Sequence, residues 1–278
     1  MRLGIDIGGT KIEGALVTEK GKVKKRKRVL TEAGKGHKKI LNNVISVIKE
    51  LDEENIEIIG VSIAGVTDSR KLYYSPNIRD LEGLELKKIL EKKTGKKVFL
   101  ENDANCFALA EQKFGAARGY DSVLGLILGT GVGGGIITHG RIYKGLGGAG
   151  EVGHMTIETG KTFEELCAGP GIINRYIHSG GKIEDPDPKK IMASREKAAR
   201  KTAADTYKYI GVGIANLINI LHPEVVVIGG GLSNLDFYDD IRAEVKKQAI
   251  PLLGKTTLIK KNELGDSSGV IGAAFLGE

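Results

Sequence analysis

Residues 98–105 read Val98-Phe99-Leu100-Glu101-Asn102-Asp103-Ala104-Asn105 and join an apolar stretch to the start of a predicted helix. The apolar part predicts a strand, so Asp103 is expected at the point where the strand ends and the helix begins. Two glycine-rich turns, residues 6–11 and 128–135, occur in the same chain. An aspartate at a strand end, together with turns that can cradle phosphates, is typical of the general base of a phosphoryl-transfer enzyme. Alternatively, Asp103 is only the N-cap of the helix from Ala104.

The composition predicts two globular domains and only a mild preference for anions. At 278 residues the chain is long for one hydrophobic core, and 41% of its residues are hydrophobic. Its 40 glycines are about twice the average share of roughly 7%. They follow apolar runs without a collagen-like period, so we expect them in turns. The net charge of +7 arises from 42 basic and 35 acidic residues.

Several classes of protein are disfavoured by the same sequence. The basic run at residues 22–28 has no interleaved aromatic residues, so it predicts a solvated edge strand better than a nucleic-acid surface. Cys106 and Cys167 cannot build a disulfide framework or a four-cysteine metal site. Residues 2–7 read as a strand instead of a signal peptide, and no apolar stretch reaches about 18 residues. We therefore expect a cytoplasmic protein that binds neither nucleic acid nor membrane.

The pattern of apolar residues predicts an α/β fold in which a strand–glycine turn–strand unit occurs twice. The expected strands are residues 2–7, 12–17, 22–30, 56–63, 97–101, 122–128 and 225–228. The expected helical stretches are residues 35–52, 84–94, 188–221, 236–248 and 269–276. A further helix is expected to begin near residue 104. Residues 147–172 are expected to form a long glycine-containing loop. The recurrence of the turn unit about 120 residues later suggests a duplicated fold.

The first turn, Asp6-Ile7-Gly8-Gly9-Thr10-Lys11, is predicted to bind phosphate. Gly8 and Gly9 let backbone N–H groups approach an anion, and Thr10 and Lys11 add a hydroxyl and a cation. Asp6 is the candidate for orienting Mg²⁺ through water. The alternative is a tight hairpin without a ligand.

Two further glycine turns complete the predicted nucleotide site. In the second, Thr130, Gly131 and Gly133 belong to a GxGxxG pattern that leads into a strand. A dinucleotide fingerprint opens a helix instead, so this turn is predicted to contact the β-phosphate. The third, formed by Gly229, Gly230 and Gly231, is predicted to hold an adenosine, or else to be an ordinary strand-to-helix turn.

Together these motifs resemble the ROK family of sugar kinases and repressors, within the actin/hexokinase superfamily. The resemblance covers nearly the whole chain and is strongest at residues 6–11, 101–105, 129–134 and Glu151-Val152-Gly153-His154. It implies a two-lobed actin-like ATPase (ribonuclease H-like) fold, each lobe a mixed β-sheet flanked by helices. The implied lobes are a small one of residues 1–104 with 265–278 returning to it, and a large one of residues 105–264.

The resemblance also implies residue roles. Asn102 would hold sugar hydroxyls, and Asp103 would be the general base. Glu151 and His154 would bind hydroxyls near the anomeric carbon. A further sugar-binding glutamate precedes a small-residue segment ending in Gly169-Pro170, which indicates Glu164, with Glu165 as the alternative. By the same resemblance, Gly65 and Asn77 would line the sugar.

The chain departs from the family pattern at one place. Many members carry three cysteines between the motif histidine and that glutamate, and these bind zinc with the histidine. Residues 155–163 contain no cysteine. Because a tetrahedral structural zinc needs four ligands, no zinc is expected, and the loop would be held by packing.

The expected activity is ATP- and Mg²⁺-dependent phosphorylation of a hexose at the 6-hydroxyl, as in a glucokinase, by a homodimer. N-acetylmannosamine, N-acetylglucosamine, fructose, mannose and allose remain alternative substrates, and loops near residues 65–80 and 139–150 would discriminate among them. A repressor would need a helix-turn-helix domain before the turn that begins at residue 6, so none is expected. A non-catalytic sugar-binding regulator and another actin-like ATPase are the remaining alternatives.

Overall fold

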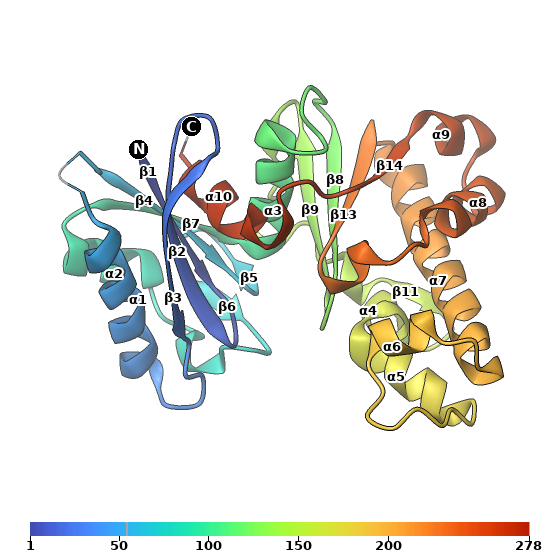
Figure 1. Cartoon of the computed structure of the whole chain (residues 1–278). Helices are drawn as coiled ribbons and strands as arrows, with labels where there is room; N and C mark the ends of the chain where they lie inside the picture. The colour runs from blue at the N-terminus through green and yellow to red at the C-terminus, as the bar shows by residue number, and fades with distance from the viewer. Residues whose placement is uncertain (54, 278) are drawn as a thin grey trace. The chain divides into compact units, whose positions relative to one another are not determined.

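The computed structural model describes residues 1–53 and 55–277 and confirms an α/β fold with two five-stranded sheets flanked by helices (Figure 1). The chain divides into two compact units. The first comprises Met1–Gly119, Gly135–Gly150 and Leu264–Glu278, and the second comprises Tyr120–Gly134 and Glu151–Glu263. The first unit thus contains residues 105–119 and 135–150, which we had expected in the large lobe. The boundaries of the lobes themselves stay a prediction.

The sheet of the first unit has the strand order β3-β2-β1-β4-β7. Its strands are β1 (Arg2–Ile7), β2 (Lys11–Val17), β3 (Val23–Leu30), β4 (Ile58–Ile63) and β7 (Lys97–Asn102). Strands β1, β2 and β3 are antiparallel neighbours, whereas β1, β4 and β7 run parallel. Parallel strands place their carboxyl ends at one edge, so the ends of β1, β4 and β7 meet there. The unit also contains the hairpin of β5 (Val66–Thr67) and β6 (Leu72–Tyr74), strand β10 (Arg141–Ile142), and the 3₁₀ turns η1 (Arg79–Leu81) and η4 (Gly265–Ser267).

Helices cover both faces of this sheet (Figure 1). They are α1 (His37–Leu51), α2 (Leu86–Thr94), α3 (Asp103–Phe114) and α10 (Ser268–Ala274). Helix α10 packs tightly on β1 and β4: a Cβ atom at Gly60 would lie 1.6 Å from the carbonyl oxygen of Ala273. Only glycine allows this approach. The C-terminal helix α10 thus lies directly against β1 and β4 of the first sheet.

The second sheet has the strand order β10-β9-β8-β13-β14. Its further strands are β8 (Val123–Leu128), β9 (Val132–Thr138), β13 (Val225–Gly229) and β14 (Leu258–Lys261). Strands β8, β13 and β14 are parallel. The helices of the second unit are α4 (Phe163–Cys167), α5 (Gly169–His178), α6 (Pro188–Ala193), α7 (Lys197–Leu221), α8 (Tyr238–Gln248) and α9 (Pro251–Thr256). No helix in the described part of the chain is both long and apolar enough to cross a lipid bilayer.

Three sequence-based expectations are wrong in detail. The expected loop at residues 147–172 contains the 3₁₀ turn η2 (Val152–His154), strands β11 (Thr156–Glu158) and β12 (Lys161–Thr162), helix α4 and the start of α5. Its glycines mark close packing as well as turns, since a Cβ atom at Gly153 would lie 2.3 Å from the carbonyl oxygen of Val132. The helical stretch 188–221 is two helices, α6 and α7. The second glycine turn is also shorter than expected, because β9 already begins at Val132.

Candidate active site

The first glycine turn, residues 6–11, is a hairpin between β1 and β2, which are paired from Arg2 to Ile7. The N–H group of Gly8 donates to the carbonyl oxygen of Lys11 at 3.0 Å, and the Thr31 hydroxyl donates to the carbonyl oxygen of Gly8 at 2.6 Å. A Cβ atom at Gly9 would lie 2.8 Å from Cβ of Asn77. The turn therefore has a fixed shape, and the first unit brings Asn77 against it. Thr10 and Lys11 are exposed, as a phosphate contact requires.

Asp6 is the penultimate residue of β1, and its carboxylate is held in place. Its Oδ1 accepts a hydrogen bond from the Ser62 hydroxyl at 2.7 Å, and Ser62 is its register partner in β4. Burial raises the pKa of Asp6, an effect that the hydrogen bond from Ser62 opposes and the charge of Glu13 adds to. A carboxylate is the ligand type that Mg²⁺ prefers, so the residue fits the predicted role. Across residues 1–53 and 55–277, no cluster of three or more His, Cys, Asp or Glu side chains could hold a metal ion.

Asn102, and not Asp103, is the N-cap of α3. The Asn102 side-chain oxygen accepts from the N–H groups of Ala104 at 2.9 Å and Asn105 at 3.1 Å. Its Nδ2 donates to the carbonyl oxygen of Gly65 at 3.0 Å. The reading of Asp103 as the cap is thus wrong; it is the first residue of the helix, half-buried, and its Oδ1 accepts from the Ala104 N–H at 3.0 Å. The first unit brings Gly65, Asn102 and Asp103 together.

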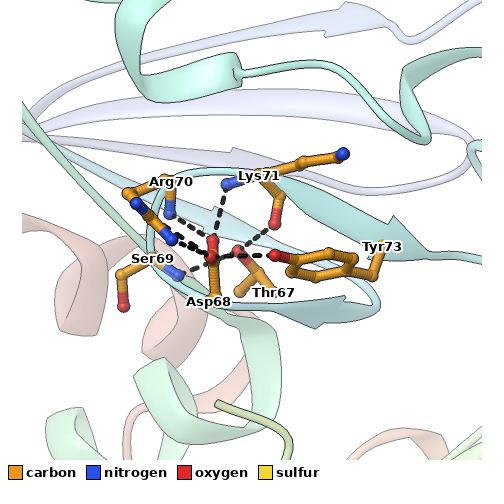
Figure 2. A network of polar contacts seen from close by, with 6 residues as sticks. All are labelled: Thr67, Asp68, Ser69, Arg70, Lys71 and Tyr73. Carbon is orange, nitrogen blue, oxygen red and sulfur yellow. Dashed lines mark hydrogen bonds and ion pairs between the residues drawn. The ribbon is translucent and has the colours of Figure 1, made fainter. Parts of the chain in front are cut away.

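The hairpin of β5 and β6, which follows Gly65, is organised around one carboxylate (Figure 2). Oδ1 of Asp68 accepts from the N–H groups of Arg70 and Lys71, both at 3.0 Å. Oδ2 accepts from Nη2 of Arg70 at 2.8 Å and from the Tyr73 hydroxyl at 3.0 Å. Burial alone would raise the pKa of Asp68, but these hydrogen bonds outweigh it and lower the pKa to about 2.

The second and third glycine turns lie side by side in the second unit, because β8 and β13 are parallel neighbours. The N–H group of Gly129 donates to the carbonyl oxygen of Gly131 at 3.0 Å and closes the second turn. Gly230 has a φ of 83°, and a Cβ atom there would lie 2.3 Å from the carbonyl oxygen of Leu128. Gly229 ends β13 and Gly231 opens the 3₁₀ turn η3 (Gly231–Asn234).

A cavity of about 430 Å³ opens beside these two turns. Its lining includes Gly129, Thr130, Pro170, Pro188, Gly231 and Leu232. This combination of apolar side chains and bare backbone suits a flat heterocycle. Gly133, which we had placed in the phosphate turn, lies inside β9, and its phosphate contact stays a prediction.

Glu151, His154 and Glu164 are neighbours in the second unit. Glu151 directly precedes the 3₁₀ turn η2, whose last residue is His154; the His154 N–H donates to the carbonyl oxygen of Glu151 at 3.2 Å. Desolvation raises the pKa of the Glu151 carboxyl; the charge of His154 opposes this and that of Glu164 adds to it. Oε2 of Glu164 accepts from the N–H group of Val132 at 2.9 Å. The glutamate thus links α4 to the end of the second glycine turn.

The adjacent residues Glu164 and Glu165 make different contacts, which distinguishes their roles. Oε2 of Glu165 accepts from the backbone N–H of Thr162 at 2.8 Å and from its hydroxyl at 3.0 Å. The Thr162 hydroxyl accepts in turn from the Glu165 N–H, which completes a capping box at the start of α4. Glu165 is therefore occupied with helix capping, whereas Glu164 faces the glycine turn.

Packing and hydrogen bonds hold residues 155–163. Phe163 is fully buried, and a Cβ atom at Gly213 of α7 would lie 2.6 Å from its ring. The Phe163 N–H donates to the carbonyl oxygen of Met155 at 2.8 Å. The Tyr209 hydroxyl lies 3.2 Å from both carboxylate oxygens of Glu158 in β11. These contacts fasten the β11–β12 hairpin to α7.

Sequence reasoning missed two features of the site. A cavity of about 670 Å³ in the second unit borders Thr130 and Glu164, and Lys161, Arg175 and Tyr209 also line it. In the first unit, the buried carboxylate of Glu101 lies directly before Asn102. A glutamate at the end of an otherwise apolar strand was the available signal for this second feature. Thr130 and Glu164 belong to motifs, but no motif marks Lys161, Arg175 or Tyr209.

The Asp68 cluster predicts a pH-dependent contribution to stability. Because the pKa of Asp68 is lowered from 3.8 to about 2, ionised Asp68 stabilises the fold above about pH 4, and this is lost as the pH falls towards about 2. We expect Asp68→Asn to lower the thermal unfolding midpoint by a few degrees near neutral pH. Thermal unfolding recorded between about pH 7 and pH 2 should show this difference shrinking below about pH 4.

The control is Glu85→Gln, which changes a largely exposed acid of the same unit. It should leave the midpoint nearly unchanged. A midpoint difference for Asp68→Asn that stays constant down to about pH 2 would contradict the assignment.

Comparison with known proteins agrees with this geometry. Residues 2–278 match the sequence profile of the ROK family. The chain is 33% identical to a glucokinase of Thermotoga maritima, in an alignment covering 99% of this chain and 96% of the relative. It is also 33% identical to an N-acetyl-D-glucosamine kinase of Photobacterium profundum, covering 99% of both chains. The crystal structure of a ROK family glucokinase from Streptomyces griseus, in complex with glucose and AMPPNP, matches with a TM-score of 0.84 and 28% identity, covering 99% of this chain and 98% of that one. The chain therefore belongs to the ROK family, has the actin-like ATPase fold of its kinases, and is a sugar kinase.

Proposed function

We propose that this kinase transfers the γ-phosphoryl group of ATP to the 6-hydroxyl of a hexose, with glucose as the preferred acceptor and Asp103 as the general base. The observation that carries the proposal is the geometry at the end of β7. There Asn102 caps α3, so Asp103 is not needed as the cap. Its carboxylate lies in the first turn of the helix, next to the residue proposed to hold the sugar.

The proposed reaction asks the protein mainly to position its substrates. The 6-hydroxyl oxygen attacks the γ-phosphorus, the bond from that phosphorus to the β–γ bridging oxygen breaks, and ADP leaves. Asp103 accepts the hydroxyl proton. Because the Asn102 amide has two N–H donors and one of them binds Gly65, we assign the other to a sugar hydroxyl.

In the same proposal, the glycine turns hold the phosphates. Backbone groups at residues 8–11 in the first unit and at Thr130 and Gly131 in the second would donate to them. The cavity beside Gly231 would take the adenosine. Mg²⁺, which Asp6 would hold through water, neutralises charge on the β- and γ-phosphates when it is bound.

Glu151, His154 and Glu164 would bind the sugar from the second unit. Their proximity supports this assignment, because charged acceptors and an imidazole gathered on one side suit a polyol. The same set would also serve N-acetylglucosamine, N-acetylmannosamine, fructose, mannose or allose, and an N-acetylglucosamine kinase is as similar to this chain as a glucokinase is. A homodimer in the cytoplasm completes the proposal.

The assignment of the base predicts the effect of Asp103→Asn. Removing a positioned base lowers kcat by about 10²–10⁴-fold, whereas sugar affinity should change little because the amide keeps the shape of the side chain. Steady-state ADP release and calorimetric sugar binding measure the two quantities. Asp239→Asn is the control, since it changes an aspartate in the first turn of another helix, α8. An Asp103→Asn enzyme with near-normal kcat would sink the assignment.

The contrast between two adjacent glutamates gives a second prediction. Glu164→Gln should weaken sugar binding by about 10-fold or more, because it replaces a charge-assisted hydrogen bond with a neutral one. Glu165→Gln is the matched control and should mainly weaken the capping of α4. The dissociation constant of the sugar is measured for both variants. A larger loss of affinity for Glu165→Gln than for Glu164→Gln would reverse the assignment.

A further inference from the structure

Glu101 is a buried acid that the proposed reaction does not use. It lies in β7 directly before Asn102 and is 1% exposed. Its Oε1 accepts from the Asn102 N–H at 3.0 Å and from Nδ2 of Asn105 at 3.1 Å. The carboxylate thus contacts two residues of the segment that carries Asp103. A buried charge is costly unless it is paired, so the residue that pairs with it matters.

Lys144 supplies the compensating charge. Its Nζ lies 2.5 Å from Oε2 of Glu101, and the lysine side chain is 44% exposed. The same Nζ donates to the Ser69 hydroxyl at 3.0 Å. Ser69 belongs to the loop between β5 and β6, and its hydroxyl points away from the Asp68 carboxylate (Figure 2). One ammonium group therefore connects the strand before Asp103 to the hairpin that follows Gly65.

Lys144 also begins the glycine-rich loop that ends the 135–150 segment of the first unit. Its carbonyl oxygen accepts from the N–H groups of Gly147 at 2.7 Å and Ala149 at 3.1 Å. A Cβ atom at Gly147 would lie 3.3 Å from Cα of Asp68, so this loop lies on the β5–β6 hairpin. Leu146 at the loop tip is fully exposed and adds no packing. Lys144 therefore closes the turn of this loop with its carbonyl oxygen and joins the loop to Glu101 and Ser69 with its ammonium group.

We propose that Glu101 and Lys144 form a positioning pair for phosphoryl transfer. The pair fixes the Asn102–Asp103 segment and holds the loops at residues 65–74 and 143–150 in one arrangement. These loops lie in the stretches expected to discriminate among sugars. The inference rests on the proposed function in one respect: it takes Asp103 as the general base, whose position determines the rate of phosphoryl transfer.

The pair acts through geometry, so its loss should reduce turnover. Without Lys144, the unpaired carboxylate of Glu101 would draw in water or move, and the Asn102 N–H and the Asn105 side chain would move with it. A displacement of about 1 Å in a catalytic group costs on the order of 10²-fold in rate. We therefore expect Lys144→Met to lower kcat on the order of 10²-fold, with a smaller change in KM for ATP.

A double-mutant cycle tests the pairing. Gln at position 101 can still accept from Asn102 and Asn105 through its oxygen, and it leaves no buried charge. The double variant Glu101→Gln/Lys144→Met should therefore be more active than Lys144→Met alone, and Lys144→Arg should recover most of the wild-type kcat. Lys27→Met is the control, because it breaks the 2.7 Å ion pair of Lys27 with Glu50, in which the lysine is similarly exposed. Its kcat should stay within about twofold of the wild type.

Two kinetic results would overturn the inference: near-normal kcat for Lys144→Met, or losses of the single variants that simply multiply in the double variant. If Lys144→Met does not fold, Glu101→Gln and Lys144→Arg decide the question. In that case Glu101→Gln must lower kcat/KM for the sugar more than Lys27→Met does. Lys144→Arg must lower kcat/KM no more than Lys27→Met does.

Hydrogen exchange separates this inference from the proposed function. Amides at residues 102–105 and 143–150 should exchange faster in Lys144→Met than in the wild type and in Lys27→Met, whether or not any sugar is phosphorylated. If the wild-type protein is inactive on every sugar, the proposed function is refuted. The hydrogen-exchange rates of the two segments then test the Glu101–Lys144 pair by themselves. Unchanged exchange in both segments would refute the pair.

Discussion

Parallel strand register places three polar side chains in one row across the sheet of the first unit, and the candidate site of that unit depends on this row. Asp6 in β1 is opposite Ser62 in β4, and Ser62 is opposite Glu101 in β7. Buried polar groups are tolerated only with partners. Ser62 donates to Asp6, and Glu101 binds Asn102, Asn105 and Lys144.

The segments that follow Asp6 and Glu101 leave the sheet and are also held by hydrogen bonds. Beyond Asp6 the chain turns into the first glycine turn, whose carbonyl at Gly8 binds Thr31. Beyond Glu101 it enters α3 through Asn102, whose amide also holds Gly65. The first glycine turn, the proposed base and the β5–β6 hairpin therefore share one framework. Because the row lies on the face packed against α10, the glycines of β1 and β4 are needed for that close contact.

In the second unit, glycine residues without side chains leave the backbone accessible at the candidate site. Its two glycine turns follow adjacent parallel strands and expose backbone to a shared cavity. Glu164 receives the Val132 N–H at the end of the second turn and connects the proposed phosphate contacts to the proposed sugar contacts. The nearby β11–β12 hairpin is held by the buried Phe163 ring and the Tyr209–Glu158 contact.

Features with a local physical signature could be predicted from the sequence. Alternating or continuous apolar runs predicted the strand that carries Asp6 and the strand that ends before Asp103. The glycine turns were located because clustered glycines directly follow such runs. The alternative reading of Asp103 as only the cap of α3 is wrong, and Asn102 is the cap; both residue types cap helices well, and only the backbone angles decide. The short elements between residues 147 and 172 were missed because glycine serves close packing as well as turns. The Glu101–Lys144 pair depends on tertiary contact, which no local pattern encodes.

The most direct measurement is a coupled ADP-release assay with Mg-ATP against glucose, mannose, fructose, allose, N-acetylglucosamine and N-acetylmannosamine, with the phosphorylated position determined by ³¹P and ¹H NMR. We expect strong turnover on at least one of these sugars, foremost glucose, and a product phosphorylated at the 6-hydroxyl. Phosphorylation at another hydroxyl, or no turnover on any of the six sugars by a folded protein, would contradict it.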